Sequence, residues 1–596
     1  MKAALWLRFF LHVNPILPPV PPRQTPSRNR TALRFVPSGV KRLFVLLLVA
    51  ATARANEISY RSLQSGWRSA ATPLTDHGLH GEGQIIAVLD TGVDYDNCFF
   101  AEPDGSRPPV NLGSPTGGLE WQNVDLNRRK IVAYDFLWSC AQYPGATGCD
   151  DPNNPLAYDN SGHGTHNAAA AVGDSGTPIV HDPLDALASG AKLIVQDGGL
   201  VNGDNCSQRP GFGCPVNLTP ILDQAYRQGA RIHSNSWGDR QGRFVNPPTA
   251  NYSASARDLD AFVASHPDML IVFNTGNYGS TAAVPPNPPP AMSIAAPGSA
   301  KNVLQVGGTR PNVDHADDTL SYNTLFGPTR DGRVKPDVVG PSLVTAATGD
   351  RNVTTNDCIT TTDGPGTSWS APSIAGAAAL VRQYYTEGFY PTGKRDLTHA
   401  LSPSAALLKA TIIASARRVP IKMTAAGDLA TAPVPSYEQG FGFPVLDDAL
   451  YFEGDRSKLR IMDVANDAGL GSGQTTTLRL SVLSGTPLQV VLVWTDPAGV
   501  PRTVFDSTPE LVHDLDLRIT GPAGLVRTGN DTLYPDRPDR VNNVEAVSMA
   551  QPVTGDYTIS INAARVGAGL RQGYALVVTG DVSDGTATRS RSVRRR

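Results

Sequence analysis

The chain has few cysteines, almost no net charge and no hydrophobic run long enough to span a bilayer, and each shortage excludes a class of protein. Its six cysteines form no Cys-x-x-Cys pair and no His-Glu-x-x-His segment occurs, so structural zinc and zincin chemistry are unsupported. Its 51 basic and 54 acidic residues nearly cancel, which leaves no chain-wide field to attract nucleic acid or an anionic membrane. We therefore expect no nucleic-acid partner and no membrane span.

One apolar stretch near the start has the form of an export signal. Residues 41–55 read KRLFVLLLVAATARA: a basic pair, a short apolar segment and a small-residue ending before Asn56. We interpret 40–55 as a signal peptide, and 1–39 as a non-native extension upstream of a true start near Val40. A buried strand is the alternative interpretation. A signal peptide predicts a secreted protein, either extracellular or periplasmic.

Export permits disulfide bonds, and the number of cysteines is even. Close spacing along the chain favours two pairs and leaves a third: Cys140 with Cys149, Cys206 with Cys214, and Cys98 with Cys358. Because six cysteines allow many connectivities, the pairing remains open at this point.

The order of apolar segments divides the chain into two regions of different character. Between about Gly83 and Leu450, short apolar runs such as QIIAVLD and AKLIVQD alternate with segments of helical period. This pattern predicts an α/β fold over 56–454, with a mainly parallel sheet flanked by helices. The strand-like runs that follow, without helices, predict an all-β sandwich or jelly roll over 455–582. The ending RSRSVRRR predicts a basic disordered tail over 583–596.

Asp90 follows directly on an apolar run, at the point where a parallel strand would end. Ligands bind at the carboxyl ends of such strands, so this position suits both a plain turn and an active site. An aspartic-protease interpretation needs a second Asp-x-Gly in a second lobe. The candidate, Asp174-Ser175-Gly176, lies in a turn with no repeated lobe around it. We reject that interpretation, and the turn and triad interpretations remain.

Two further segments place a reactive side chain just before a helix of small residues. DNSGHGTHNAAAAVG carries His163, and GPGTSWSAPSIAG carries Ser368. Each alone can be a helix cap, and His163 with His166 could suggest a metal, although no acidic or thiol group stands nearby at ligand spacing. The chain order Asp90, His163, Ser368 is, however, the order of the subtilisin type of serine-nucleophile triad.

The segments around these residues resemble the subtilase family. VLDTGVD around Asp90, GHGTH around His163 and GTSWSAP around Ser368 match its triad motifs. IVFNTGNYG carries Asn277 where subtilases keep the side-chain donor of the oxyanion hole. The resemblance covers about 81–446 and implies a subtilisin-like fold.

The resemblance also implies an activity, that of a secreted serine endopeptidase. Ser368 would be the nucleophile, His163 the general base and Asp90 the residue that orients His163. Asn277 would donate a hydrogen bond to the oxyanion of an acyl-enzyme reaction.

The substrates implied are proteins and peptides in an extended conformation. The segment SNSWG lines the substrate groove in the family, so the main chain of Ser236, Trp237 and Gly238 would pair with the peptide. We expect the protein to be a monomer.

Trp369 departs from the family pattern, which places Met directly after the nucleophile. This departure keeps an alternative open, in which the chain is a catalytically impaired secreted protein that binds peptides or surfaces. The segment between the predicted signal and the first catalytic strand is also too short to be a subtilase propeptide.

The β-rich end resembles the C-terminal β-barrel of one alkaline branch of subtilases, through VVLVWTDP, HDLDL and DRVNNVE. Four residues there offer oxygen ligands of the kind that Ca²⁺ takes, and calcium is common in the family: Asp514, Asp516, Asn543 and Glu545. The alternative is that they solvate loops at the edge of a sandwich. The chemistry itself requires no cofactor.

Overall fold

The computed structural model describes residues 54–585, with gaps at 67–68, 70, 115–117, 138, 140–150, 154–157, 160–161, 177–181, 199–216, 239–249, 279–290, 311–318, 322, 350–357, 363–364, 423–428, 431–432 and 504. They belong to the unit Ala50–Arg596. The predicted extension, nearly all of the predicted signal and most of the predicted tail lie outside the described residues and stay predictions. In the described part of the chain, no helix combines the length and the hydropathy that a membrane crossing needs.

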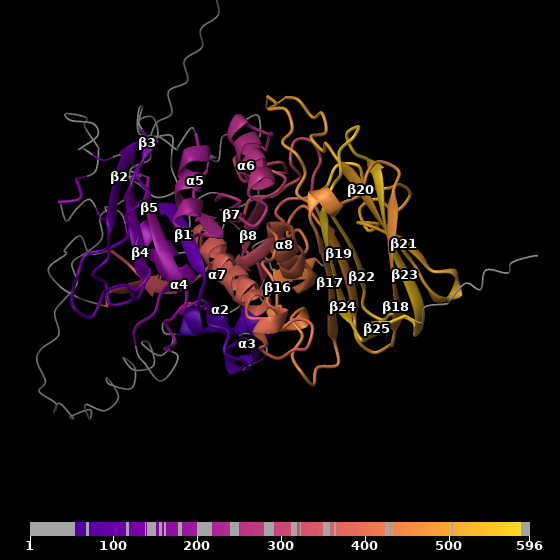
Figure 1. The fold of residues 1–596 in the computed structure, drawn as a ribbon, viewed down its shortest axis with the longest axis horizontal. Coiled ribbons are helices and arrows are strands. Elements are labelled where there is room, and N and C mark those ends of the chain that lie inside the picture. The colour runs from indigo at the N-terminus through magenta and orange to yellow at the C-terminus, as the bar shows by residue number, and fades with distance from the viewer. Residues whose placement is uncertain are drawn as a thin grey trace, which may run out of the picture. The chain divides into compact units, whose positions relative to one another are not determined.

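A ten-stranded sheet forms the centre of the first region (Figure 1). Its order is β10-β8-β7-β6-β1-β5-β4-β2-β3, with β9 paired to β8. The strands are β1 (Ile85–Asp90), β2 (Val110–Ser114), β3 (Gly118–Leu119), β4 (Ile131–Phe136), β5 (Lys192–Asp197), β6 (Ile232–Asn235), β7 (Leu270–Asn274), β8 (Leu304–Arg310), β9 (Thr319–Leu320) and β10 (Val338–Pro341). In this spatial order, all neighbouring strands from β10 across to β2 are parallel. The two edge pairs, β2 with β3 and β8 with β9, are antiparallel. The predicted α/β fold with a mainly parallel sheet is confirmed.

The helices of the first region pack against this sheet or against neighbouring elements, and one of them is buried almost all round. The helices are α2 (Arg54–Ser65), α3 (Pro73–Asp76), α4 (His163–Val172), α5 (Thr219–Arg227), α6 (Ala254–Ser265), α7 (Thr367–Thr386) and α8 (Ala405–Ala414). The central helix, α7, contacts α4, α8 and the strands from β6 to β10 in the sheet (Figure 1). A Cβ on Gly376 of α7 would lie 2.9 Å from the carbonyl oxygen of Ala171 in α4, so the two helices approach where only glycine fits.

Short elements complete the described part of this region. They are β11 (Thr345–Ala347) with β12 (Thr360–Thr362), β13 (Ala416–Arg417) with β16 (Phe443–Pro444), β14 (Ile421–Lys422) with β15 (Leu429–Ala430), and the 3-10 helices η2 (Leu397–His399) and η3 (Leu446–Asp448). At the other end of the region, α2 begins just before the predicted cleavage point at Asn56.

The second region consists of two antiparallel sheets. One has the order β17-β24-β19-β22 and the other β21-β20-β23-β18-β25. Their elements are β17 (Lys458–Val464), η4 (Asn466–Ala468), β18 (Thr475–Val482), β19 (Leu488–Val493), β20 (Asp514–Thr520), η5 (Pro522–Gly524), β21 (Val526–Thr528), β22 (Val544–Met549), β23 (Gly555–Arg565), β24 (Tyr574–Gly580) and β25 (Val582–Asp584). Side chains from both sheets, such as Leu492 and Ile559, share one buried core. The predicted sandwich is therefore present.

The four-stranded sheet is covered on both of its faces. Val490 and Leu492 of β19 point into the sandwich core, whereas Val491 and Val493 join the core of the first region under α8. Successive side chains of a strand point to opposite faces, so a strand buried on both sides reads as a continuous apolar run. This explains why β19 is apolar at nearly every position.

A buried ion pair and several buried hydrogen bonds also link the first region to the second. Lys301 is fully buried, and its Nζ lies 2.5 Å from a carboxylate oxygen of Asp496 and 2.8 Å from the carbonyl oxygen of Glu510. Asn302 exchanges two further hydrogen bonds with the main chain of Asp496, both 2.9 Å long. These contacts tie the loop before β8 to the loop after β19.

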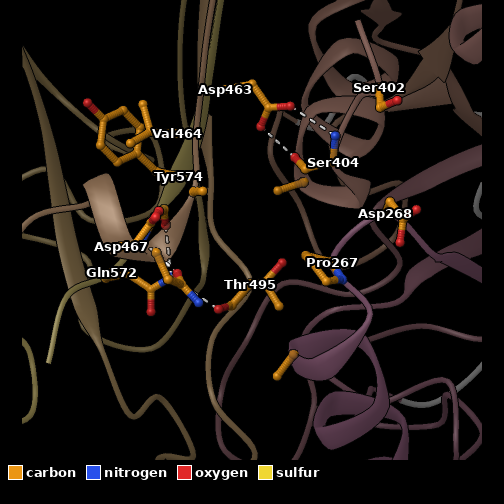
Figure 2. A pocket seen from close by; sticks show the side chains of 15 residues that line it. Pro267, Asp268, Ser402, Ser404, Asp463, Val464, Asp467, Thr495, Gln572 and Tyr574 are labelled. Atoms are coloured by element: carbon orange, nitrogen blue, oxygen red, sulfur yellow. Dashed lines mark hydrogen bonds between the residues drawn. The ribbon is translucent and has the colours of Figure 1, made fainter. Parts of the chain in front are cut away.

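A pocket of about 480 Å³ lies beside this interface, between α8 and the ends of β17 and β24 (Figure 2). One carboxylate that lines the pocket, Asp463, accepts hydrogen bonds from the main-chain N–H and the hydroxyl of Ser404, at 2.9 and 2.6 Å. Asp268 on the opposite wall accepts the hydroxyl of Tyr226 at 3.0 Å and faces the guanidinium of Arg231 at 2.7 Å. Because these polar groups are bonded to the protein itself, the pocket identifies no ligand.

We expect Asp496→Ala to lower the free energy of unfolding by about 3–5 kcal/mol, because the change leaves the Lys301 charge buried without its carboxylate. Denaturant unfolding of the purified protein measures this. The matched control is Asp223→Ala, which breaks the exposed pair between Asp223 and Arg227 and should cost less than about 1 kcal/mol. An equally small loss in both variants would contradict the importance of the buried pair.

Candidate active site

Asp90 stands at the carboxyl end of β1 with only 2% of its surface exposed. Its Oδ1 lies 2.7 Å from His163 Nδ1 and also accepts the Thr91 N–H at 2.8 Å. Its Oδ2 accepts the side-chain amide of Asn167 at 2.8 Å. A carboxylate held by three donors cannot rotate away from the imidazole without losing hydrogen bonds.

This contact decides which ring nitrogen of His163 carries the proton. An ionised carboxylate only accepts hydrogen bonds, so Nδ1 must be the donor and Nε2 is left as the basic nitrogen. The side chain of His163 is 15% exposed, so the ring can reach a substrate as well as Asp90.

His163 is the first residue of α4, and glycines on both sides allow its position. Gly162 has a φ of 75°, which side-chain-bearing residues rarely adopt. A Cβ on Gly164 would lie 2.0 Å from the carbonyl oxygen of Gly92 in the loop after β1. The Gly-His-Gly sequence thus lets the start of α4 touch the loop that carries Asp90.

Ser368 lies in the first turn of α7, next to Asn277 from the loop after β7. The Oδ1 of Asn277 accepts the N–H of Thr367 at 2.9 Å and its hydroxyl at 3.0 Å. Since an N–H only donates, this fixes the amide with Nδ2 as the donor end. The hydroxyl of Ser236 donates to the carbonyl oxygen of Ser368 at 2.7 Å.

Trp369 links the two halves of the site. Its ring centroid lies 5.2 Å from that of His163 and 4.0 Å from that of His166, and the side chain is buried. Burial, and secondarily the charge on His163, lower the pKa of His166 to about 3, so His166 is neutral and packs like an aromatic residue. Trp369 therefore packs α7 against α4.

The predicted groove residues differ in what they can offer a substrate. The indole of Trp237 is 2% exposed and packs on Phe273, with ring centroids 5.2 Å apart, so it belongs to the core. A Cβ on Gly238 would lie 3.0 Å from the carbonyl oxygen of Ala296. Substrate pairing through the main chain of Ser236, Trp237 and Gly238 stays a prediction.

The predicted disulfide between Cys98 and Cys358 is present, across a sequence separation of 260 residues. It joins the loop after β1 to the segment before α7, and the side-chain amide of Asn97 bonds the same segment at the carbonyl oxygen of Ile359, at 3.1 Å. The other four cysteines lie outside the described residues.

The four predicted calcium ligands are hydrogen-bonded or ion-paired to other groups of the protein. Arg540 contacts the carboxylates of both Asp514 and Asp516. The side-chain amide of Asn543 bonds Asn302 and Trp494, and Glu545 accepts the Leu517 N–H at 2.6 Å. Within the described ranges, no group of three or more His, Cys, Asp or Glu residues is placed to hold a metal. Asp514 and Asp516 therefore share the guanidinium of Arg540 as their counter-charge.

Calcium binding by these four residues stays a prediction, which melting the protein with and without a chelator tests. A lower midpoint with chelator would support a bound ion, and an unchanged midpoint would contradict one. We expect Arg540→Met to lower the midpoint in both buffers, because it removes the cation that two neighbouring carboxylates share. A midpoint of Arg540→Met that equals that of the wild type would show that Arg540 does not stabilise the two carboxylates.

Two hydrogen-bond partners of the predicted triad residues were not foreseen from the sequence. Asn167 lies four residues after His163, which places both on one face of α4, so helical spacing could have suggested it. Thr91 carries no such signal, because its hydroxyl accepts the Gly164 N–H at 2.8 Å only once the two segments meet.

A parallel sheet with a histidine-carboxylate pair at its carboxyl edge, and a serine at the start of a buried helix, is the arrangement expected of the serine hydrolase class. The chain belongs to the subtilase family, whose model matches residues 81–442. This membership supports a serine peptidase and confirms the resemblance to subtilases noted over about 81–446. The likeness of the β-rich end to the barrel of one alkaline branch stays a prediction.

Similar proteins include serine protease/ABC transporter B family protein tagA of Dictyostelium discoideum, which is 24% identical over 611 residues, 85% of this chain and 31% of that protein. Subtilisin-like protease SBT2.3 of Arabidopsis thaliana is 31% identical over 206 residues, 34% of this chain and 23% of that protein. The chain thus spans less than a third of the length of these relatives.

Among solved structures, the serine protease of Aeromonas sobria aligns over 89% of this chain and 95% of its own, with 15% identity and a TM-score of 0.38. Fervidolysin from Fervidobacterium pennivorans aligns over 84% and 55%, with 14% identity and a TM-score of 0.39. The assignment of fold accordingly rests on the sheet topology and the family model.

Proposed function

We propose that this chain is a secreted serine endopeptidase, which cleaves peptide bonds through an acyl-enzyme formed on Ser368. The observation that carries the proposal is the 2.7 Å contact between Asp90 and His163, in a segment order shared with the family. His163 takes the proton of Ser368 during attack and returns it to the leaving amine. Asp90 holds the imidazole tautomer and stabilises the imidazolium.

Charge that develops on the substrate carbonyl oxygen needs fixed donors. Asn277 offers its Nδ2, because its oxygen is engaged by Thr367. The main-chain N–H of Ser368 stands in the first turn of α7, where the helix dipole favours negative charge. The two donors come from different segments, which the hydrogen bonds from Thr367 to Asn277 Oδ1 hold together.

The alternative, a catalytically impaired binding protein, rested on the bulk of Trp369. The indole lies closer to the ring of His166 than to that of His163, with centroids 4.0 and 5.2 Å apart, and Ser236 donates to the main chain of Ser368. This packing supports the catalytic proposal over the alternative. We further propose a monomer that acts on extended proteins and peptides, paired along the main chain of Ser236, Trp237 and Gly238.

Labelling with a fluorophosphonate tests the proposal. We expect a single adduct in the intact mass of the wild type and none on Ser368→Ala. The matched control is Ser370→Ala, since Ser370 lies on the same helix with its hydroxyl bonded to the carbonyl oxygen of Gly340. Ser370→Ala should be labelled like the wild type. A folded wild type without an adduct would contradict an activated Ser368.

Asn277→Ala tests the oxyanion role. We expect kcat on a peptide substrate to fall about 100- to 1,000-fold with KM nearly unchanged, because the donor acts mainly in the transition state. Steady-state kinetics measures both constants. A rise in KM with an unchanged kcat would instead assign Asn277 to ground-state binding.

A further inference from the structure

Asp159 is a buried carboxylate just before α4 that the triad chemistry does not use, and it collects four hydrogen bonds. It is 2% exposed. Its Oδ1 accepts the Thr91 hydroxyl at 3.1 Å and the Gly162 N–H at 2.9 Å. Its Oδ2 accepts the N–H and the hydroxyl of Thr165, at 3.0 and 2.5 Å. A neutral group of the same shape could not accept from all four donors.

These hydrogen bonds connect Asp159 to the segment that carries Asp90 and to the segment that carries His163. Gly162 and Thr165 lie on either side of His163, so Asp159 holds the backbone on both flanks of the imidazole. Thr91 follows Asp90 directly, and its own N–H donates to Asp90 Oδ1. The Thr91 hydroxyl also accepts the Gly164 N–H, which closes a ring of hydrogen bonds between the two segments.

The helix gives this role to Asp159 because it lacks an ordinary cap. The residue before α4 is Gly162, which has no side chain to accept the first N–H groups of the helix. Asp159 supplies that acceptor from outside the helix, and its charge suits the positive end of the helix dipole. The same carboxylate that caps α4 thus ties it to the loop after β1.

We propose that Asp159 is a positioning residue, which acts through Thr91 and the start of α4 to set the distance between Asp90 and His163. The proposal rests on the proposed function, since it concerns the geometry of the same triad. It differs from a purely structural cap in one respect. Loss of the carboxylate lowers the rate of the chemical step more than it lowers substrate binding.

The experiment compares Asp159→Asn with Asp185→Asn. Asp185 is a matched control, because it too is buried and accepts main-chain N–H groups, from Ser175 at 2.7 Å and Asp182 at 3.1 Å, beyond the other end of α4. Both variants should melt at lower temperature than the wild type. Only Asp159→Asn should also lose about 100-fold in kcat and in the rate of fluorophosphonate labelling, with KM nearly unchanged.

A second variant, Thr91→Val, keeps the shape of the side chain and removes the hydroxyl between Asp159 and Gly164. It should lower kcat in the same way, and the double variant Thr91→Val with Asp159→Asn should be no slower than the slower single variant, because both changes break one network. Additive losses would overturn the proposal. Thr91→Val also provides the test if Asp159→Asn does not fold.

The outcomes separate this inference from the function on which it rests. A folded wild type that the fluorophosphonate does not label overturns the proposed function. A wild type that is labelled, beside an Asp159→Asn protein labelled at the same rate, overturns the positioning role alone. A loss of kcat in Asp185→Asn equal to that in Asp159→Asn also overturns it, because general destabilisation would then explain both.

Discussion

The candidate site depends on the close contact between the start of α4 and the loop after β1. The two backbones meet where a Cβ on Gly164 would overlap the carbonyl oxygen of Gly92. Only at this separation can His163 Nδ1 reach Asp90 Oδ1, and only then does Thr91 reach the N–H of Gly164. The glycines of the histidine motif are therefore required by the backbone as much as by the chemistry.

The β-rich region packs against the first region through a shared buried core and through buried polar contacts. The alternate side chains of β19 enter two cores, and Lys301 finds its carboxylate, Asp496, in the other region. A buried ammonium without a carboxylate is costly, so the two regions depend on each other for stability. The composition of the sequence changes near Gly454, where the secondary structure becomes all-β. Contacts such as those of α8 with β19 and β24 nevertheless join the two regions.

Much of the fold was predictable because its signals are local. Alternation of apolar runs with helical segments predicted the parallel sheet, and the strand-only texture predicted the sandwich. The second region shows the limit of such reasoning: residue type suggested calcium ligands, but the sequence did not indicate that Arg540 would pair with two of the four, Asp514 and Asp516. Likewise, Trp369 departs from the family pattern in the sequence, and only the structure shows that its indole packs on His166 between α7 and α4.

By itself, the sequence determined the class of fold, the order of Asp90, His163 and Ser368, and the family, because motif residues and short-range periodicity are written along the chain. The tertiary structure alone decided how Asp159 and Thr91 join the segments of Asp90 and His163. It also decided that β19 is covered on both of its faces. The reason is physical. Hydrogen bonds such as that from Thr91 to Asp159 link residues 68 positions apart, and no local pattern specifies such a partner.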